Sequence, residues 1–340
     1  MKDTAITKKK WVIFSLVAVA VFMSTLDSSI VNLALPAIMK DLEVPFTTIE
    51  WVPMIYLLTV SSLLLSFGRL SDIKGRRWVY CRGFILFSIA SLICGVSPDA
   101  KWLIAARALQ GIAAAMLMAC SPALVVDAFP ASERGRALGM VGTAVAAGLT
   151  AGPVLGGLIV DLFSWRAIFY INIPIGIVSA IIAFQILRGT KGDIVRREPF
   201  DWKGALLLAF GFSLFIYVIS SAYDWGFTST RTILLLITSI ISIVWFLQIE
   251  KRMDYPIFQT SLLKIRIFIF PVISAAILFV SLFTMVFLMP FYLVYPYGFS
   301  IDKAGYTMVI PFVFLFFISP LSGYFQTVSD HAYFAHWVCW

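Results

Sequence analysis

A succession of long apolar runs is the feature that most constrains this chain. Each run has roughly 17 to 25 residues, the length a helix needs to cross about 30 Å of hydrocarbon. The runs are Trp11–Leu35, Trp51–Phe67, Trp78–Val96, Trp102–Val126, Arg136–Val160, Arg166–Leu187, Lys203–Tyr223, Arg231–Ile249, Ile267–Phe291 and Lys303–Pro320. Composition agrees, because 61% of the residues are hydrophobic and only 13% are charged, against about 25% charged in soluble domains. We therefore predict an all-α, polytopic membrane protein with about ten transmembrane helices.

Lysine and arginine are unequally divided between the two sides of these runs. With the N-terminus in the cytoplasm, the inside segments hold 20 of the 26 basic residues and the outside loops hold 5. Cytoplasmic loops of membrane proteins carry such an excess. We therefore expect a multi-pass protein of the cell membrane with a cytoplasmic N-terminus. The net charge of +8 then serves topology and contact with anionic lipid, so nucleic-acid binding is not expected.

Two charged residues, Asp27 and Arg107, lie well inside the predicted spans. Counted from the outer ends at Leu35 and Trp102, they sit at a similar depth in the outer half of the bilayer. Such groups are costly in lipid, so they normally face a partner or a watery cavity and mark an ion or substrate path. Burial favours the neutral carboxyl, whereas the guanidinium favours the carboxylate, which predicts a proton-coupling site. A purely structural ion pair between two helices is the alternative.

Cysteine and histidine give no sign of a metal or disulfide. The four cysteines lack CxxC or paired spacing, so neither a disulfide framework nor a zinc site is expected. The only histidines, His331 and His336, lie near Cys339 at a spacing that fits no familiar zinc pattern. No cofactor is expected. An enzyme is not expected either, because no cluster at the edge of a span offers a nucleophile with a histidine base.

The segment GRLSDIKGRR, residues 68 to 77, links the second and third runs. We expect Gly68 and Gly75 to permit tight turns and Asp72 to cap the next helix. Composition alone allows an ordinary basic loop. In this position, however, the pattern G-x-L-S-D-x-x-G-R-R resembles the signature loop of the major facilitator superfamily. The resemblance implies a latch for one gating state, formed by Gly68, Arg69, Asp72, Gly75, Arg76 and Arg77, with Asp127 as a partner for the arginines.

Two further segments resemble motifs of the same superfamily. RALQGIAAA, residues 107 to 115, resembles the fourth-helix motif in which the arginine is implicated in proton transfer, a role that falls on Arg107. GLTAGPVLGG, residues 148 to 157, resembles the fifth-helix motif typical of antiporters. Its small residues predict a smooth face for close helix packing, and its proline permits a bend. The motif residues are Gly148, Gly152, Pro153, Gly156 and Gly157.

The first run carries LDSSIVNLALP, residues 26 to 36. It resembles the first-helix motif of the fourteen-helix drug:proton antiporters, the EmrB/QacA-type branch, with Ser29 in place of the usual threonine. WRAIFYINIPIG, residues 165 to 176, is also typical of that branch. The resemblance implies export of lipophilic, often cationic compounds in exchange for protons, with Asp27 loading and releasing the proton and Arg107 tuning it. The candidates for the substrate cavity are Asn32, Gln110 and Met116.

The resemblance also predicts the organisation of the chain. It divides the chain into an N-terminal six-helix bundle (1–187), a cytoplasmic linker (188–202), two extra helices (203–249), the two-helix start of a C-terminal bundle (250–323) and an atypical tail (324–340). Because the resemblance stops after Gly323, we interpret the chain as truncated at its C-terminus, with about ten helices of an expected fourteen.

Two other functions remain open, and no oligomeric state is defined. One is a non-transporting remnant or interaction partner for another transporter, suggested by the tail. The other is a proton-independent metabolite exporter, in which Asp27→Asn would leave transport unchanged.

Overall fold

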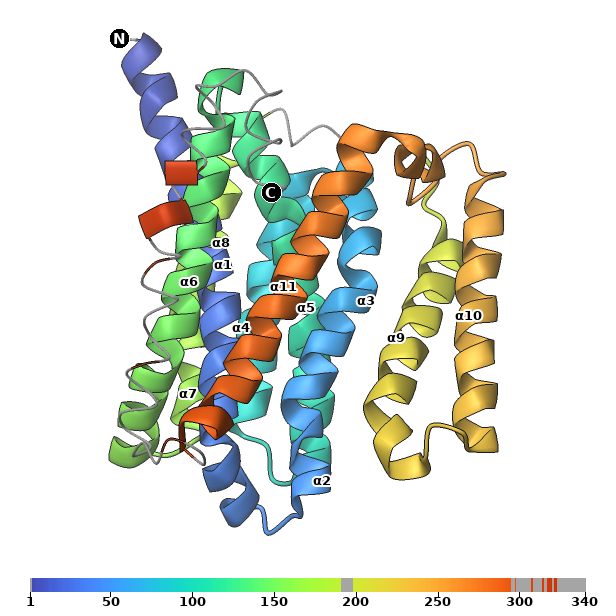
Figure 1. Ribbon diagram of the computed structural model, residues 1–340. Coiled ribbons are helices and arrows are strands. Elements are labelled where there is room, and N and C mark those ends of the chain that lie inside the picture. Colours follow the sequence, from blue (N-terminus) through green and yellow to red (C-terminus); the bar gives the residue numbers. More distant parts are fainter. Residues whose placement is uncertain are drawn as a thin grey trace.

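A computed structural model describes residues 2–190 and 198–294, with positions 297, 307, 314, 317–319 and 321–322 beyond them. Every regular element in these residues is a helix (Figure 1). The elements are α1 (Lys2–Asp41), α2 (Phe46–Ile49), α3 (Trp51–Lys74), α4 (Arg76–Gly95), α5 (Ala100–Ala128), α6 (Ala131–Leu162), α7 (Ala167–Tyr170), α8 (Asn172–Ile186), α9 (Trp202–Trp225), α10 (Thr230–Glu250), the 3-10 helix η2 (Thr260–Lys264) and α11 (Arg266–Val294).

Eight segments of the described chain are long and apolar enough to cross a membrane. They coincide with the first eight predicted runs, so the all-helical, multi-pass prediction is confirmed. The ninth run falls on α11, which extends over Arg266–Val294. The tenth run lies almost wholly outside the described residues, as does most of the segment from 295 onward.

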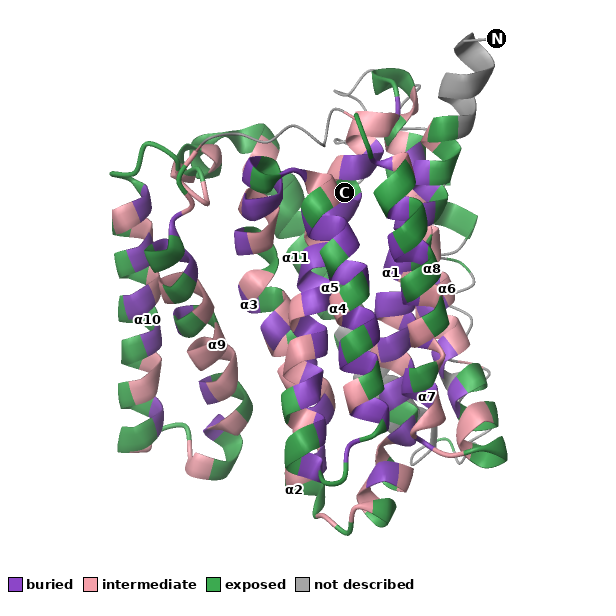
Figure 2. Cartoon of the chain, turned by 180° about the vertical axis from the view of Figure 1, so that it is seen from behind, coloured by how far each residue is buried: buried purple, intermediate pink, exposed green. Residues whose placement is uncertain are grey.

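The first six spans pack into a bundle around α1 and α5. α1 lies along α6 and α5, while α5 also packs against α3 and α4, and α4 against α8. Buried residues concentrate on the inner helices (Figure 2). The approach of α3 to α5 is close at Gly111, where an added Cβ would lie 2.9 Å from the backbone oxygen of Tyr56. This packing brings the middle of α1 and the middle of α5 into the same interior.

α9 and α10 form a pair beside α3, apart from the middle of the bundle (Figure 1). Two serines join the pair: Ser239 Oγ donates to the carbonyl of Gly211 at 2.8 Å, and Ser242 Oγ donates to that of Leu207 at 3.0 Å. Trp51 of α3 meets Tyr217 of α9 with ring centroids 5.4 Å apart. The pair therefore has its own interface and contacts the bundle along one edge.

The link between α3 and α4 is shorter than predicted. The α3 helix continues to Lys74, so Gly68 lies inside a helix and the expected turn there is wrong. Only Gly75 breaks the helix, with a φ of +89° that side chains other than glycine rarely adopt. Asp72 lies in the last turn of α3 and does not cap α4, whose N-cap is Gly75. A single glycine costs a helix only about 1 kcal/mol, which neighbouring apolar residues outweigh at Gly68.

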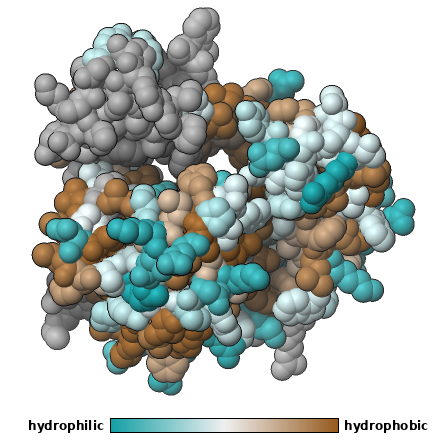
Figure 3. All heavy atoms as spheres, turned by 90° about the horizontal axis from the view of Figure 1, so that it is seen from below, coloured by the Kyte–Doolittle hydropathy of each residue, from teal (hydrophilic) through white to brown (hydrophobic). Residues whose placement is uncertain are grey.

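Hydrogen bonds between polar side chains also join the helices at the opposite end of the bundle. Asp41, at the end of α1, accepts hydrogen bonds from Trp165 Nε1 at 2.9 Å and from Arg166 Nη1 at 2.7 Å. Arg166 Nη2 also donates to the carbonyl of Ser97 at 3.3 Å. Figure 3 views the molecule from this end, where hydrophilic side chains gather across the face and apolar ones surround them. These contacts hold α1, the end of α4 and the start of α7 together.

Candidate functional site

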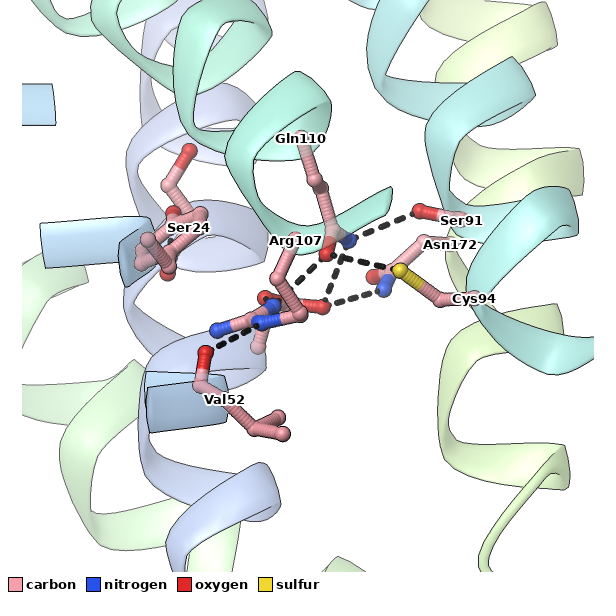
Figure 4. A network of polar contacts seen from close by, with 9 residues as sticks. Ser24, Val52, Ser91, Cys94, Arg107, Gln110 and Asn172 are labelled. Atoms are coloured by element: carbon pink, nitrogen blue, oxygen red, sulfur yellow. Dashed lines mark hydrogen bonds and ion pairs between the residues drawn. The ribbon is translucent and has the colours of Figure 1, made fainter. Parts of the chain in front are cut away.

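The centre of the bundle holds one carboxylate with three hydrogen-bond donors (Figure 4). Asp27 on α1 is 1% exposed. Its Oδ2 accepts from Arg107 Nη1 at 2.5 Å, and its Oδ1 accepts from Gln110 Nε2 and from Asn172 Nδ2, both at 2.9 Å. Donors from α5 and α8 thus converge on a side chain of α1. Hydrogen bonds to a carboxylate favour its charged form, which offsets part of the cost of burial.

Arg107 is fully buried on α5 and is held on several sides. Its Nη1 also donates to Gln110 Oε1 at 2.6 Å, and its Nε donates to the carbonyl of Val52 at 3.2 Å. The guanidinium lies over the ring of Tyr56, 4.2 Å from the centroid, a cation–π contact that strengthens away from water. Its Nη2 has no hydrogen-bond partner among the described residues. The arginine is therefore held in one position, while its Nη2 makes no hydrogen bond to the described residues.

The sequence predicted Asp27 and Arg107 as one site and Gln110 as a cavity residue, but it missed the rest of this cluster. Gln110 Nε2 donates to Ser91 Oγ at 2.9 Å as well as to Asp27, which connects α4. Asn172 lies in the segment WRAIFYINIPIG, where its amide is a polar group in an apolar helix. That polarity is the signal that could have identified it as a partner of the buried charge.

The cluster is balanced in charge and closed to solvent in this conformation. It contains one carboxylate, one guanidinium and the two neutral amides of Gln110 and Asn172. Two polar atoms of this cluster, Arg107 Nη2 and Asn172 Oδ1, are buried without a partner among the described residues. Loss of either charge would leave the other buried without a counter-charge, a strongly disfavoured state.

The glycines of α6 lie directly against α1, the helix that carries Asp27. A Cβ added at Gly148 would lie 2.0 Å from Thr25 Oγ1, one at Gly152 would lie 2.3 Å from Ser29 Oγ, and one at Gly156 would lie 2.8 Å from Ile30 Cγ1. Gly157 is less confined, since its added Cβ would meet Leu33 Cδ2 at 3.8 Å. Pro153 lies within α6. The first three glycines allow the two backbones to approach closely.

Salt bridges gather at the end of the bundle where α3 ends and α4 begins, here called the basic end. Arg76 forms a salt bridge with Asp127 and also donates to the carbonyl of Ala123 at 3.0 Å. Its second contact with an acid is weaker, 3.5 Å from Nη2 to Asp72 Oδ1. The expected pairing of Asp127 with an arginine of the signature segment is therefore present, and it joins α4 to the end of α5.

Three other contacts at the basic end bring in partners that the sequence did not identify. Arg69 Nη2 binds Glu198 Oε2 of the linker at 2.8 Å. Lys10 Nζ binds Glu133 Oε2 of α6 at 2.5 Å. Arg77 Nε donates to the carbonyl of Phe184 at 3.1 Å, joining α4 to α8. The basic residues predicted to hold a loop in the cytoplasm thus also tie helices and linker together.

The three cavity candidates have different surroundings. Gln110 is part of the Asp27 cluster, and Met116 is buried in the apolar core next to Gly83. Asn32 is exposed on α1. A role for these residues in holding substrate stays a prediction. Among the described residues, no group of three or more histidine, cysteine or acidic side chains is arranged to hold a metal, and the tail with His331 and His336 lies outside them.

Comparison with known proteins gives a consistent result. The sequence profile of the Major Facilitator Superfamily matches residues 17–331. The riboflavin transporter RibZ of Clostridioides difficile is 34% identical over 93% of this chain and 68% of its own length. The multidrug resistance protein Stp of Mycobacterium tuberculosis is 33% identical over 89% of this chain and 56% of its own length. Multidrug resistance protein 3 of Bacillus subtilis is 31% identical over 96% and 64%.

The chain thus spans from just over half to two thirds of the length of these relatives. A solved structure with the same fold is that of the human organic anion transporter MFSD10, at a TM-score of 0.55 and 16% identity, covering 94% of this chain and 72% of that one. At that identity the likeness concerns the fold alone.

Proposed function

The chain belongs to the major facilitator superfamily, and we propose that it exports a lipophilic small molecule in exchange for protons, with Asp27 as the proton carrier. Membership in this family supports transport of a small molecule across a membrane rather than catalysis of a reaction. The proposed mechanism therefore rests on binding and conformational change. The finer assignment to the fourteen-helix drug:proton antiporters is supported by the helix pair α9–α10, which comes between the six-helix bundle and α11 along the chain.

The observation that carries the proposal is the buried pair of Asp27 with Arg107. A membrane protein gains little stability from a buried ion pair, because desolvation of both charges opposes their attraction. A titratable acid held against a fixed arginine inside a helix bundle is instead suited to proton movement. Gln110 and Asn172 can remain in place as the charge changes, since each is neutral.

Proton exchange requires that Asp27 be reached from each side of the membrane in turn. In this conformation the carboxylate is closed to solvent, so release needs a movement of α1 relative to α5 or α8. The close glycine contacts with α6 make α1 and α6 a natural unit for such a movement. Transporters of this type move repeats or bundles against one another around a site near the midplane.

The basic end is proposed to face the cytoplasm and to act as a latch. The excess of lysine and arginine there supports this orientation. The salt bridge of Arg76 with Asp127 and that of Arg69 with Glu198 tie α4 to α5 and α3 to the linker. Breaking these contacts would free the cytoplasmic ends of the helices.

The names of the relatives suggest two substrate classes. Two are multidrug resistance proteins and one is a riboflavin transporter. We propose a lipophilic or cationic drug-like compound as the substrate, and riboflavin as the second candidate because its transporter matches 93% of this chain.

The experiment is efflux from proteoliposomes or everted vesicles that contain the 340-residue chain. A fluorescent lipophilic cation and riboflavin would be tested separately, with and without a proton gradient. Asp27→Asn should abolish proton-driven efflux, whereas Asp224→Asn, a matched change at an exposed position on α9, should not. Efflux that persists in Asp27→Asn would support a proton-independent exporter. No efflux by folded, inserted protein would support a non-transporting role.

A further inference from the structure

A pair of buried acids lies where the linker enters α9 and α10 ends. Asp201 is 8% exposed and Glu250 is 3% exposed. One oxygen of each, Asp201 Oδ2 and Glu250 Oε1, is buried without a hydrogen-bond partner among the described residues. Unpartnered buried polar atoms are uncommon in folded proteins and call for a physical explanation.

The two unpartnered oxygens border the same space beside Gly204. A Cβ added to this glycine would lie 2.2 Å from Asp201 Oδ2 and 3.2 Å from Glu250 Oε1. Gly204 therefore leaves no side chain between the two carboxyl groups. Their other oxygens are occupied, since Asp201 Oδ1 accepts from the backbone N–H of Gly204 at 2.9 Å and Glu250 Oε2 accepts from that of Phe258 at 3.4 Å.

The charges that face this pair do not balance it. Arg69 from α3 attracts Glu250, but its Nη2 already binds Glu198 of the linker at 2.8 Å. One guanidinium thus serves both Glu198 and Glu250. The flanking cations Lys203, Lys251 and Arg252 are exposed to solvent. Two carboxyl groups that share a buried site do not both ionise readily.

We propose that Asp201 and Glu250 bind one proton between them and so form a second proton-binding site, separate from Asp27. One carboxyl oxygen carries the proton and the other accepts its hydrogen bond, which pairs both unpartnered atoms. Loss of the proton leaves two facing negative charges and loosens the junction between the linker and α10. Because Arg69 binds Glu198 of the linker and attracts Glu250, the proton also affects the signature segment. This proposal does not depend on transport.

The test is thermal unfolding of the purified full chain in detergent from about pH 5.5 to about pH 9, with a chelator present. The folded protein would hold a proton that the unfolded chain has released, so stability should fall as pH rises. If the folded protein binds one proton more than the unfolded chain, Tm should decrease on the order of 2 °C per pH unit. Glu250→Gln should remove this decrease, because the amide replaces the protonated acid. Asp201→Asn should do the same, and its side-chain oxygen can still cap α9. Asp254→Asn, at an exposed position, should retain the wild-type slope.

Infrared spectroscopy gives a second readout that a purely structural role would not change. The difference spectrum, wild type minus Glu250→Gln, should contain a protonated-carboxyl band that disappears as pH rises. If Glu250→Gln does not fold, the difference spectrum of wild type minus Asp201→Asn serves the same purpose. Equal pH slopes in wild type and both variants, or absence of the band, would overturn the proposal. Recovery of stability at high pH on adding Na⁺ or Mg²⁺ would also overturn it, in favour of a metal cation.

Discussion

Arg107 Nη1 donates to Asp27 Oδ2 at 2.5 Å, although the two residues lie 80 positions apart in the chain. Both side chains are shielded from solvent, and their contact joins α1 to α5 in the middle of the bundle. Apolar side chains of similar volume would join the helices without the cost of desolvating two charges. This cost is the reason for assigning the pair a functional role, and it makes the pair sensitive to the loss of either partner.

Removal of the arginine should destabilise the protein strongly at neutral pH. Arg107→Gln leaves Asp27 buried with its amide donors but without a cation, and the expected loss is about 3–5 kcal/mol. Asp27 is then more stable in its neutral form, so the folded protein takes up a proton that the unfolded chain has lost. Stability should therefore recover as pH falls towards the ordinary range of a carboxyl group. Thermal unfolding in detergent at several pH values measures both effects.

The matched control is the double variant Asp27→Asn with Arg107→Gln. It removes both charges, so it should be more stable at neutral pH than Arg107→Gln alone and should lose the recovery at low pH. A double variant as unstable as the single one would show that packing of the arginine, including its contact with Tyr56, matters more than the charge pair.

The sequence was a good guide to the spans and to the central charge pair. Runs of apolar residues are strong signals because lipid penalises polar residues within a span. An isolated charge inside a span is a strong signal because lipid penalises it unless it has a partner. The hydrogen-bonding and ion-pair partners of the predicted residues were harder to identify from the sequence. Asn172 is an uncharged amide, and Glu198 lies in a polar linker where acids are ordinary, so neither reveals its neighbour without the fold. The turn expected at Gly68 failed for another reason: a helix tolerates one glycine when flanking residues favour it.

Close packing of α1 on α6 should make Gly152 intolerant of a methyl group. In Gly152→Ala the new Cβ would lie 2.3 Å from Ser29 Oγ and 2.5 Å from Ser29 Cβ. One of the helices must shift, at an expected cost of about 1–3 kcal/mol. The Tm in detergent and the fraction of inserted protein measure this loss.

Two variants control for this effect. Gly157→Ala should be tolerated, because its Cβ would have only an ordinary contact at 3.8 Å with Leu33. Ser29→Gly should rescue Gly152→Ala in part, since it removes the atoms that clash. Equal losses for Gly152→Ala and Gly157→Ala would contradict a specific contact between α6 and α1 at this level.

The salt bridges of Arg76 should contribute unequally. Asp127→Asn removes the close partner, whose side chain is 27% exposed, and Asp72→Asn removes the distant one, which is 45% exposed. Exposed pairs contribute about 0–1 kcal/mol, so Asp72→Asn should have little effect on Tm. Asp127→Asn should lower Tm more than Asp72→Asn does. This decrease in Tm should be larger without added salt than with it, because salt screens the ion pair of the wild type. A ranking of the two variants in the opposite order would contradict the geometry.

Orientation of the chain in the membrane should be measurable with single cysteines. Cys81, Cys94 and Cys120 are buried, and replacing all four cysteines gives a background without reactive thiols. Lys101→Cys and Arg188→Cys then place one thiol at each end of the bundle, both at exposed positions. If the basic end is cytoplasmic, a membrane-impermeant maleimide should label Lys101→Cys on intact cells and should label Arg188→Cys only after the membrane is opened. The reverse pattern would place the N-terminus outside, and the proposed direction of drug and proton movement would have to be reversed with it.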